Sequence, residues 1–240
     1  KVLQTNVSQT NINEVSNILN TTTGNRIAIC NANTLVRSAR SSDIADIINN
    51  FTIKAPDGFP VAKALSILTK QNFPRVDGYK VFLQTISDGL DKNRSHYFFG
   101  SDELTTKLMI EKLKKVYPKI KVNGYMCPEI LDSDQLAEKY IDVLKNVNAD
   151  IIWVSLGFPK QEMFIDTVCK SKNINSNFIG IGGVFEWVAE TKKKAPEWVA
   201  DMGFEWLSRL MQDPKRLYKR YLIDNTLFMV YFLRQVLFRR

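Results

Sequence analysis

The sequence predicts an α/β protein with a Rossmann-like parallel sheet core, flanked by helices, and a helical C-terminal appendage. Short apolar runs rich in β-branched residues alternate with segments of helical periodicity, which is typical of parallel strands joined by right-handed crossovers. Beyond Glu190 the composition changes, and basic and aromatic residues become frequent. We therefore expect an α/β core at residues 1–190 and a basic, aromatic helical appendage at residues 191–240.

The first half of the chain shows this alternation only loosely. Residues 1–25 are polar and rich in Asn and Thr, and Gly24-Asn25 marks a turn before the first clear strand. After that turn, apolar residues recur at strand or helix spacing. The expected elements are a strand at 26–31, a helix at 34–50, a strand at 51–55, and helices at 59–68 and 81–89.

The second half is more regular. Asp102 is expected to cap one helix and Ser133 a later one, because short polar side chains satisfy the first backbone N–H groups of a helix. The expected strands are at 96–99, 119–125, 151–154 and 177–181, and the expected helices are at 103–117, at 133–146 and from the turn near Pro159 to residue 172. The basic stretch 192–196 is interpreted as a hinge that precedes the appendage.

The stretch from Ala149 to Phe164 indicates where a ligand binds. It has the pattern of a buried strand, a tight turn at Gly157 and a helix start at Pro159. Gln161 and Glu162 then lie in the first helical turn at the carboxyl edge of the sheet. Open α/β sheets bind ligands at this edge, and a helix N-terminus favours phosphate. The alternative is an ordinary strand-to-helix turn with solvated polar side chains.

Three further polar residues are expected at the same edge. Asn31 ends the first strand, Asp57 follows the second in a Pro-Asp-Gly turn, and Arg75 precedes Gly78 in a loop. A carboxylate beside a glycine is a candidate general base, and a nearby arginine could hold a diphosphate. Each has a structural alternative, because Asn often caps helices, Pro-Asp-Gly is a common turn and Arg75 could simply be solvated.

Charge is distributed unevenly along the chain. The net charge is +8, and residues 192–240 hold eleven Lys and Arg against five Asp and Glu. A basic tail indicates nucleic acid, an anionic membrane surface or a phosphorylated ligand as the partner. We expect no signal peptide, and no stretch approaches the roughly 20 apolar residues that span a bilayer.

The residues that usually bind metals are sparse. The three cysteines lie far apart without a C-x-x-C pair, which is typical of free thiols in a reducing compartment. The single histidine, His96, precedes an apolar run and is interpreted as structural. No metal-ligand cluster is recognisable in the sequence, so we expect neither a metal ion nor a cofactor.

Several short motifs follow one another along nearly the whole chain. They are Ile29-Cys-Asn-Ala32, Ala55-Pro-Asp-Gly58, Arg75-Val-Asp-Gly78, the stretch 149–162, Gly180-Ile-Gly-Gly-Val-Phe185, Ala195-Pro-Glu-Trp198, Glu205-Trp-Leu-Ser-Arg-Leu210 and Pro214-Lys-Arg-Leu-Tyr-Lys-Arg-Tyr221. In these motifs and their order, the chain resembles the WecG/TagA/CpsF family of bacterial glycosyltransferases. Among its departures from the family pattern, Lys194 replaces a usual Arg, Glu186 a frequent Asp and Asp77 a small residue.

The resemblance implies a reaction and a set of partners. It implies inverting, metal-independent transfer of a sugar from a UDP-sugar donor to an undecaprenyl-diphosphate-linked sugar acceptor, without a cofactor. The product would belong to a cell-surface polysaccharide or a wall polymer. Such a protein is expected in the cytoplasm, peripheral on the inner face of the cell membrane.

The resemblance also implies roles for particular residues. Asp57 matches the general base, and Asn31, Arg75 and Gln161 match substrate-site residues. We add three residues from the matching motifs to the substrate-binding set, namely Gly78, Glu162 and Glu186. Arg209 and Arg216 match appendage arginines that would reach the donor diphosphate, and Lys219 or Arg220 would be a third.

The appendage has two further interpretations on physical grounds. Arginines folded over the site would stabilise the charge of a UDP leaving group, and a basic, aromatic helical surface suits an anionic membrane. The alternative is a packed helix pair with a solvated basic face. Its apolar side could also pack on a second copy, so a homo-oligomer is left open.

Two other functions compete with the enzyme as interpretations of this sequence. A basic nucleic-acid-binding α/β protein would use the tail but would leave Asp57 and Arg75 without a role, so no nucleic acid is expected as a partner. Thermal stabilisation by UDP would favour the enzyme, whereas crosslinking to RNA would favour this alternative. A catalytically inactive scaffold is disfavoured because Asp57, Arg75 and Gln161 are intact.

Overall fold

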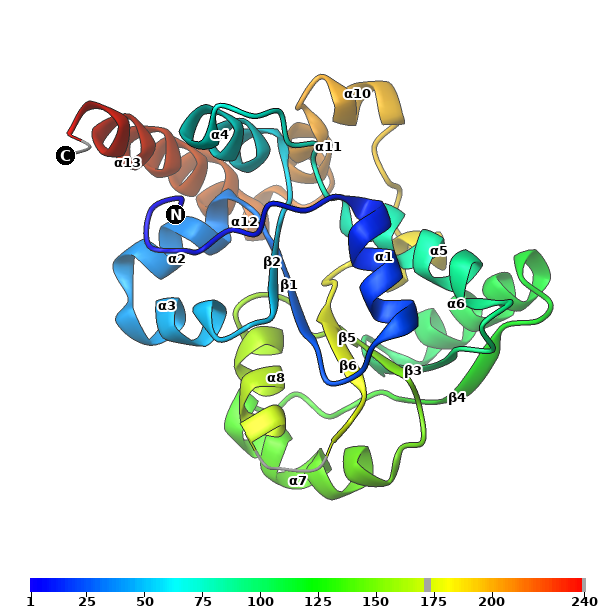
Figure 1. Cartoon of the computed structure of the whole chain (residues 1–240). Helices are drawn as coiled ribbons and strands as arrows, with labels where there is room; N and C mark the ends of the chain where they lie inside the picture. Colours follow the sequence, from blue (N-terminus) through cyan, green and yellow to red (C-terminus); the bar gives the residue numbers. More distant parts are fainter. Residues whose placement is uncertain (171–173, 239–240) are drawn as a thin grey trace.

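Six parallel strands form one sheet through the middle of the molecule (Figure 1). The computed structural model describes residues 1–170 and 174–238, with only the backbone described at Asp201 and Arg216. The strands are β1 (Arg26–Cys30), β2 (Ile53–Pro56), β3 (Ser95–Gly100), β4 (Lys121–Met126), β5 (Ile151–Ser155) and β6 (Asn177–Gly180), and their order is β2-β1-β6-β5-β3-β4. The predicted parallel α/β fold is confirmed.

Helices cover both faces of the sheet. On one face lie α2 (Ala32–Arg40), α3 (Ser42–Asn49), α7 (Ser133–Asn146) and α8 (Lys160–Lys170), together with α4 (Phe59–Thr69). On the other face lie α1 (Ile12–Thr21), α5 (Gly78–Gly89), α6 (Glu103–Val116) and α9 (Val184–Val188). The connections therefore run over both faces, and because the strands are parallel their carboxyl ends all point to the same edge.

Strand side chains alternate between two apolar cores, one on each face. In β5, Ile152 and Val154 belong to the core around Phe164 of α8. The intervening Trp153 faces the other core, where its ring centroid lies 4.7 Å from that of Phe82 in α5. All five side chains are fully buried. Because the sheet is buried on both faces, its strands are near-continuous apolar runs in the sequence.

A helix occurs near the N-terminus where none was predicted. In α1, Val15 and Leu19 are fully buried and pack into the second core. The Asn11 side chain caps the helix by accepting the Glu14 backbone N–H at 3.0 Å. The many Asn and Thr residues of this segment hide a narrow apolar stripe at helical spacing.

The single helix predicted at 34–50 is wrong, because the segment forms two helices. Ser41 adopts an extended conformation between α2 and α3, with φ −141° and ψ 118°. Its hydroxyl oxygen accepts the Ile44 backbone N–H at 3.4 Å and thereby starts α3. The sequence signal was present, since Ser and Asp at the start of an apolar repeat are typical helix caps.

The predicted cap at Ser133 is wrong, because Ser133 is already the first helical residue and Asp132 is the cap. Asp132 accepts the backbone N–H of Gln135, whose side chain accepts the Asp132 backbone N–H in return, which is a capping box. The predicted end of the following helix at residue 172 lies outside the described residues.

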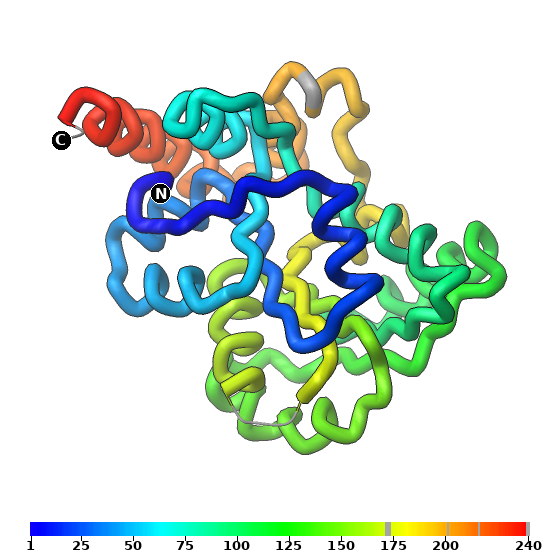
Figure 2. The backbone as a smooth tube through the Cα atoms, viewed as in Figure 1, coloured from blue at the N-terminus to red at the C-terminus, as the bar shows by residue number. Residues whose placement is uncertain are grey.

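The C-terminal segment folds back over the carboxyl edge of the sheet as a series of short helices. They are α10 (Glu197–Asp201), α11 (Glu205–Gln212), α12 (Pro214–Tyr218), the π-helix η1 (Lys219–Asp224) and α13 (Asn225–Leu237). Figure 2 shows that this path ends beside the N-terminus, where the Gln235 side chain accepts the Leu3 backbone N–H at 2.8 Å. Phe228 and Phe232 of α13 are buried in the first core. None of the described helices has the length and apolar content needed to cross a bilayer.

Candidate active site

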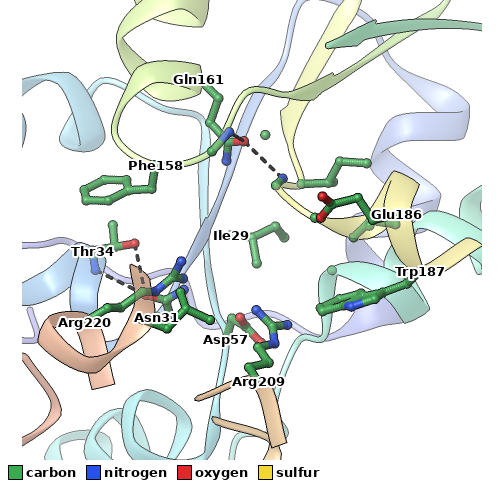
Figure 3. A pocket seen from close by; sticks show the side chains of 18 of the residues that line it. Ile29, Asn31, Thr34, Asp57, Phe158, Gln161, Glu186, Trp187, Arg209 and Arg220 are labelled. Carbon is green, nitrogen blue, oxygen red and sulfur yellow. Dashed lines mark hydrogen bonds between the residues drawn. The ribbon is translucent and has the colours of Figure 1, made fainter. Parts of the chain in front are cut away.

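The carboxyl ends of four strands carry the predicted site residues. Asn31 follows β1, Asp57 follows β2, Gln161 lies in α8 after β5, and Glu186 lies in α9 after β6. Two adjoining pockets open between these strand ends and the C-terminal helices. We call them the inner pocket, lined by the turns after β5 and β6 and drawn in Figure 3, and the outer pocket, lined by the start of α4 and by α11.

The two pockets share one wall, which contains a carboxylate and two arginines. The shared residues are Asn31, Asp57, Arg209, Arg220 and Tyr221. The inner pocket adds four more of the predicted residues, Gly78, Gln161, Glu162 and Glu186. Arg75 lines the outer pocket instead. The side chain of Arg216 lies outside the described part of the structure, so its predicted role stays a prediction.

Asp57 stands where the two pockets meet. Its backbone N–H donates to the Cys30 carbonyl oxygen at 2.9 Å, which fixes the turn after β2 to the end of β1. Gly58 has φ +77°, a conformation that few residues other than glycine adopt, and the chain turns away there into α4. In Figure 3 the Asp57 carboxylate lies next to the Arg209 guanidinium. The Pro-Asp-Gly sequence is thus a turn that also presents its carboxylate to both pockets.

The surroundings of Asp57 make it easier to protonate than an ordinary aspartate. Burial raises the pKa of Asp57 to about 6, and the neighbouring carboxylates of Asp77 and Glu205 act in the same direction. The positive charges of Arg209 and Arg75 oppose this increase. A carboxylate that titrates near neutral pH matches the requirement for a general base that must take up a proton and release it again.

Gln161 holds two turns together under the inner pocket. Its Oε1 atom accepts the Gly157 backbone N–H at 3.2 Å and the Gly182 backbone N–H at 3.0 Å. Its Nε2 group donates to Glu162 Oε1 at 2.8 Å. A Cβ atom on Gly180 would lie 2.7 Å from this Nε2 atom, so the glycine leaves room for the amide. Gln161 therefore shapes the pocket floor as well as lining it.

Glu162 is a buried carboxylate at the same pocket. Burial raises its pKa to about 7, while the hydrogen bond from Gln161 and the positive charge of Arg220 pull the pKa down. Its Oε2 atom is buried and has no hydrogen-bond partner among the described residues. Buried polar atoms are rarely left unpaired, so this oxygen is available to a hydrogen-bond donor on a bound ligand.

Asn31 and Gly78 border the inner pocket from β1 and α5. The Asn31 side chain accepts the Thr34 backbone N–H at 3.3 Å, so Asn31 caps α2. Its capping and its place in the pocket wall are compatible, because the cap uses only the amide oxygen. Gly78 is the first residue of α5 and is buried; a Cβ atom there would be 3.6 Å from Ile29, an ordinary contact. Gly78 thus lines the pocket without a steric need for glycine.

Arg75 is not a solvated side chain. Its Nη2 atom lies 3.0 Å from Asp77 Oδ2, and its Nη1 atom lies 2.8 Å from Glu205 Oε2. The Asp77 carboxylate also pairs with Lys194 Nζ at 3.0 Å and caps α5 by accepting the Tyr79 backbone N–H at 2.8 Å. Asp77, one of the departures from the family pattern, is therefore an anchor for two cations.

The appendage contributes two arginines to the shared wall. The Arg209 guanidinium lies 4.1 Å from the centroid of the Trp187 ring, and its Nη2 atom lies 2.6 Å from Glu205 Oε1. Arg220, from the π-helix, lies beside Asn31 in Figure 3. Lys219, the other residue proposed as a third cation, is exposed and lies over the Tyr218 ring. Only Arg220 of this pair lines a pocket.

Some lining residues were not predicted. They include Phe158, Trp187, Glu205 and Tyr221. Glu205 begins one of the family-like motifs, and Trp187 lies two residues after the end of another, but neither has a local pattern that distinguishes a ligand contact from a core residue. The sequence does not reveal that these residues line the pockets, because the pockets form only when the C-terminal helices fold over the sheet.

Residues outside the pockets have structural roles. His96 is buried, and its Nδ1 atom accepts the Trp153 indole N–H at 3.1 Å. Burial lowers the pKa of His96 to about 4, which agrees with the structural interpretation of this residue. Cys30, Cys127 and Cys169 are free. Among the described residues, no group of three or more His, Cys, Asp or Glu side chains is arranged to hold a metal ion.

Comparison with known proteins places this site in a family. Three relatives carry the name N-acetylglucosaminyldiphosphoundecaprenol N-acetyl-beta-D-mannosaminyltransferase. The one from Bacillus subtilis (strain 168) is 26% identical over 79% of this chain and 72% of its own length. That from Bacillus spizizenii is 28% identical over 67% of this chain and 61% of its own length. That from Staphylococcus aureus (strain MW2) is 27% identical over 72% of this chain and 66% of its own length.

Two of these three alignments cover less than two thirds of the relative's own length. The match to the family model covers more of this chain than any of these three alignments. The model, described as glycosyl transferase WecG/TagA/CpsF family, matches residues 1–240. The predicted resemblance is confirmed, and the chain belongs to the WecG/TagA/CpsF family of glycosyl transferases.

Proposed function

We propose that this protein transfers a sugar from a UDP-sugar donor to a sugar carried on undecaprenyl diphosphate, with inversion and without a metal ion. The observation that carries the proposal is the position of Asp57, which stands between two pockets and is flanked by arginines of both parts of the chain. Transfer needs one site for the donor, one for the acceptor and a base between them. The named relatives support the substrate class, since their name specifies an undecaprenol-linked diphosphate sugar acceptor.

The inner pocket suits the donor and the outer pocket the acceptor. Arg209 and Arg220 in the shared wall would face the donor diphosphate, because guanidinium groups match phosphate oxygens in charge and geometry. Arg75 lies only in the outer pocket and would face the diphosphate of the acceptor. In this arrangement, Asp57 adjoins the acceptor hydroxyl and the donor sugar at the same time.

The proposed reaction is a single displacement. Asp57 accepts the proton of the acceptor hydroxyl, and that oxygen attacks C1 of the donor sugar from the face opposite UDP. The new glycosidic C–O bond forms while the bond between C1 and the phosphate oxygen breaks, and UDP leaves with the electron pair. Arg209 and Arg220 stabilise the charge that develops on UDP, as fixed cations aimed at a leaving group.

The relatives suggest which sugars to test first. Their name combines an N-acetylmannosaminyl group that is transferred with an N-acetylglucosaminyl acceptor. In this chain, the buried Glu162 Oε2 atom and the amide of Asn31 are two polar groups of the inner pocket that could recognise an N-acetyl or hydroxyl substituent. A screen of UDP-sugars for UDP release, with a short-chain polyprenyl-diphosphate-linked N-acetylglucosamine as acceptor, tests the proposal. Failure of every donor to release UDP would contradict it.

A membrane surface is the third proposed partner, and a place on the inner face of the cell membrane follows from it. Large apolar side chains are exposed along the C-terminal helices, including Trp198, Met202, Phe204, Leu207, Met211, Leu222, Ile223, Val230, Leu233 and Leu237. An apolar surface of this extent usually marks contact with a protein or a membrane. An acceptor anchored by a polyprenyl chain favours the membrane, whereas a second copy of the chain is the alternative.

A further inference from the structure

Glu205 connects the two parts of the molecule that supply cations to the proposed site. It is the first residue of α11, in the C-terminal segment, and its side chain is 15% exposed. Its two carboxylate oxygens bind different arginines. Oε2 pairs with Arg75 Nη1 at 2.8 Å, and Oε1 pairs with Arg209 Nη2 at 2.6 Å. The first pair crosses from α11 to the loop before α5, and the second lies within α11.

The two arginines depend on Glu205 to different degrees. Arg75 has a second anionic partner in Asp77. Arg209 instead rests on the Trp187 ring, and its Nε atom is buried without a hydrogen-bond partner among the described residues. Glu205 is therefore the carboxylate that fixes the direction of the Arg209 guanidinium. An arginine that pairs with a carboxylate and stacks on an aromatic ring loses little further freedom when a ligand binds.

We propose that Glu205 is a positioning residue for sugar transfer, whose single carboxylate holds Arg75 of the core and Arg209 of the appendage on the two sides of Asp57. The proposal rests on the function proposed above. In that function, Arg209 faces the donor diphosphate and Arg75 faces the acceptor diphosphate, so Glu205 aligns both cations. The site is then complete only when α11 is docked on the loop before α5.

The charge of Glu205 has a second effect, on Asp57. The charged groups that shift the pKa of Asp57 are Asp77 at the start of α5, Arg75 in the preceding loop, and Glu205 and Arg209 on α11. Arg220 of the π-helix lines the same shared wall. The Glu205 carboxylate raises the pKa of Asp57, so loss of its charge should lower that pKa. This gives a readout that loss of packing alone would not produce.

Two variants separate geometry from charge. Glu205→Gln keeps the side-chain length but removes the charge, whereas Glu205→Asp keeps the charge but is one methylene too short to reach both arginines. Glu197→Gln is the matched control, because Glu197 on α10 also pairs with a core cation, Lys80, but at an exposed position outside both pockets.

The experiment measures kcat, KM and the pH dependence of kcat/KM with the full-length chain. Both Glu205 variants should lose about tenfold or more in kcat, because misplacing a substrate-holding group by about 1 Å can cost that much or more. The acid limb of kcat/KM should move about half a pH unit lower in Glu205→Gln and stay in place in Glu205→Asp. Glu197→Gln should match the unmodified chain throughout. A Glu205→Gln variant with unchanged kcat and an unchanged acid limb would overturn the proposal.

Amide hydrogen exchange of the ligand-free chain gives a test that needs no turnover. Residues 205–212 should exchange faster in Glu205→Gln and Glu205→Asp, because α11 loses its link to Arg75, and should be unaffected in Glu197→Gln. Equal exchange of α11 in all four proteins would contradict the link. If the unmodified chain releases no UDP from any donor, the proposed function fails, while the exchange data still decide whether Glu205 docks α11.

Discussion

At the scale of single residues, the proposed chemistry depends on a carboxylate that is costly to keep ionised. Asp57 lies among Asp77 and Glu205, and the opposing charges of Arg75 and Arg209 do not cancel their effect, since its pKa is still raised to about 6. A group placed in this way is poorly suited to stabilising the fold. It is well suited to accepting a proton at neutral pH, so its position is best explained by function.

The variant Asp57→Asn should separate function from stability. We expect kcat to fall by roughly 10² to 10⁴, because the base is lost while the shape is kept. The same variant should be more stable at pH 7.5, by about 1 to 2 kcal/mol, because the raised pKa means that the folded state disfavours the ionised form. Thermal unfolding and UDP release measure the two effects. The exposed Asp91→Asn is the control, and an Asp57→Asn variant with near-normal kcat would exclude Asp57 as the base.

The raised pKa also predicts the direction of pH dependence. The base must be ionised to act, so kcat/KM should fall as the pH drops through about 6. The stability gained in Asp57→Asn should shrink as the pH falls from about 6 toward 3.8, the ordinary pKa of Asp, and vanish below that value, where Asp57 is protonated in both the folded and unfolded states. Glu162 is the other group whose titration could cause the fall of kcat/KM at low pH, because its pKa is raised to about 7. An acid limb that is lost in Glu162→Gln would assign the titration to Glu162 instead.

The arginines of the shared wall lead to a prediction about metals. Arg209 and Arg220 both line the inner pocket, and guanidinium groups can neutralise a diphosphate as Mg²⁺ does in other transferases. We therefore expect full turnover in excess EDTA. The measurement is UDP release before and after chelation. Loss of turnover with EDTA and recovery with Mg²⁺ or Mn²⁺ would rule out this mechanism.

At the scale of elements, the site is built by turns that are tied to one another. Gln161 accepts one backbone N–H from the turn after β5 and one from the turn after β6, and so fixes the distance between them. Gln161→Leu has a similar volume but leaves both N–H groups without this partner. Each unpaired buried donor costs about 1 to 3 kcal/mol.

We therefore expect Gln161→Leu to lower the free energy of unfolding by about 2 to 4 kcal/mol and to raise the KM for the donor. Gln84→Leu is the control, since among the described residues the Gln84 side chain donates a hydrogen bond to Asn13 alone, at the surface of α5. Chemical denaturation and donor titration measure the two effects. Unchanged stability in Gln161→Leu would show that water or the Glu162 side chain replaces the lost amide.

Most strands, and the edge of the sheet that carries the site, could be predicted from the sequence. The strands were recognisable because their buried residues form apolar runs, as in 151–154, and strand ends mark the site because parallel strands share one carboxyl edge. The N-terminal helix was missed because only its stripe around Val15 and Leu19 is apolar. The break at Ser41 was missed because the apolar spacing continues across it, although the backbone turns there.

Contacts between distant elements were beyond sequence reasoning. Periodicity shows that one side of a helix is apolar but does not show which surface covers it. The pairing of Glu205 with Arg75 joins residues 130 positions apart, and neither residue has a local pattern that indicates the other. The π-helix that carries Arg220 toward the pocket is likewise invisible in the spacing of its residues, because π-helices are rare and have no simple repeat.

At the scale of the whole molecule, the C-terminal helices have two apolar sides. Phe228 and Phe232 of α13 are buried against the core, whereas Val230 and Leu233 on the same helix are about half exposed. A helix of a globular protein usually presents polar residues on its outer side. The outer side of α13 is therefore suited to shallow insertion into a lipid surface, with basic residues at the headgroups.

The apolar outer side of α13 leads to a prediction about the effect of placing charged residues there. The double variant Val230→Glu/Leu233→Glu should fold normally, because both side chains are exposed, but should sediment less with anionic liposomes, since buried apolar area and headgroup attraction both decrease. Turnover should fall with a long-chain acceptor in vesicles and persist with a short, water-soluble acceptor. The control is Leu104→Glu/Val116→Glu, which changes two exposed apolar residues of α6, remote from the C-terminal helices. Unchanged liposome binding together with a loss of oligomer mass would show that a second copy of the chain, and not a membrane, covers this surface.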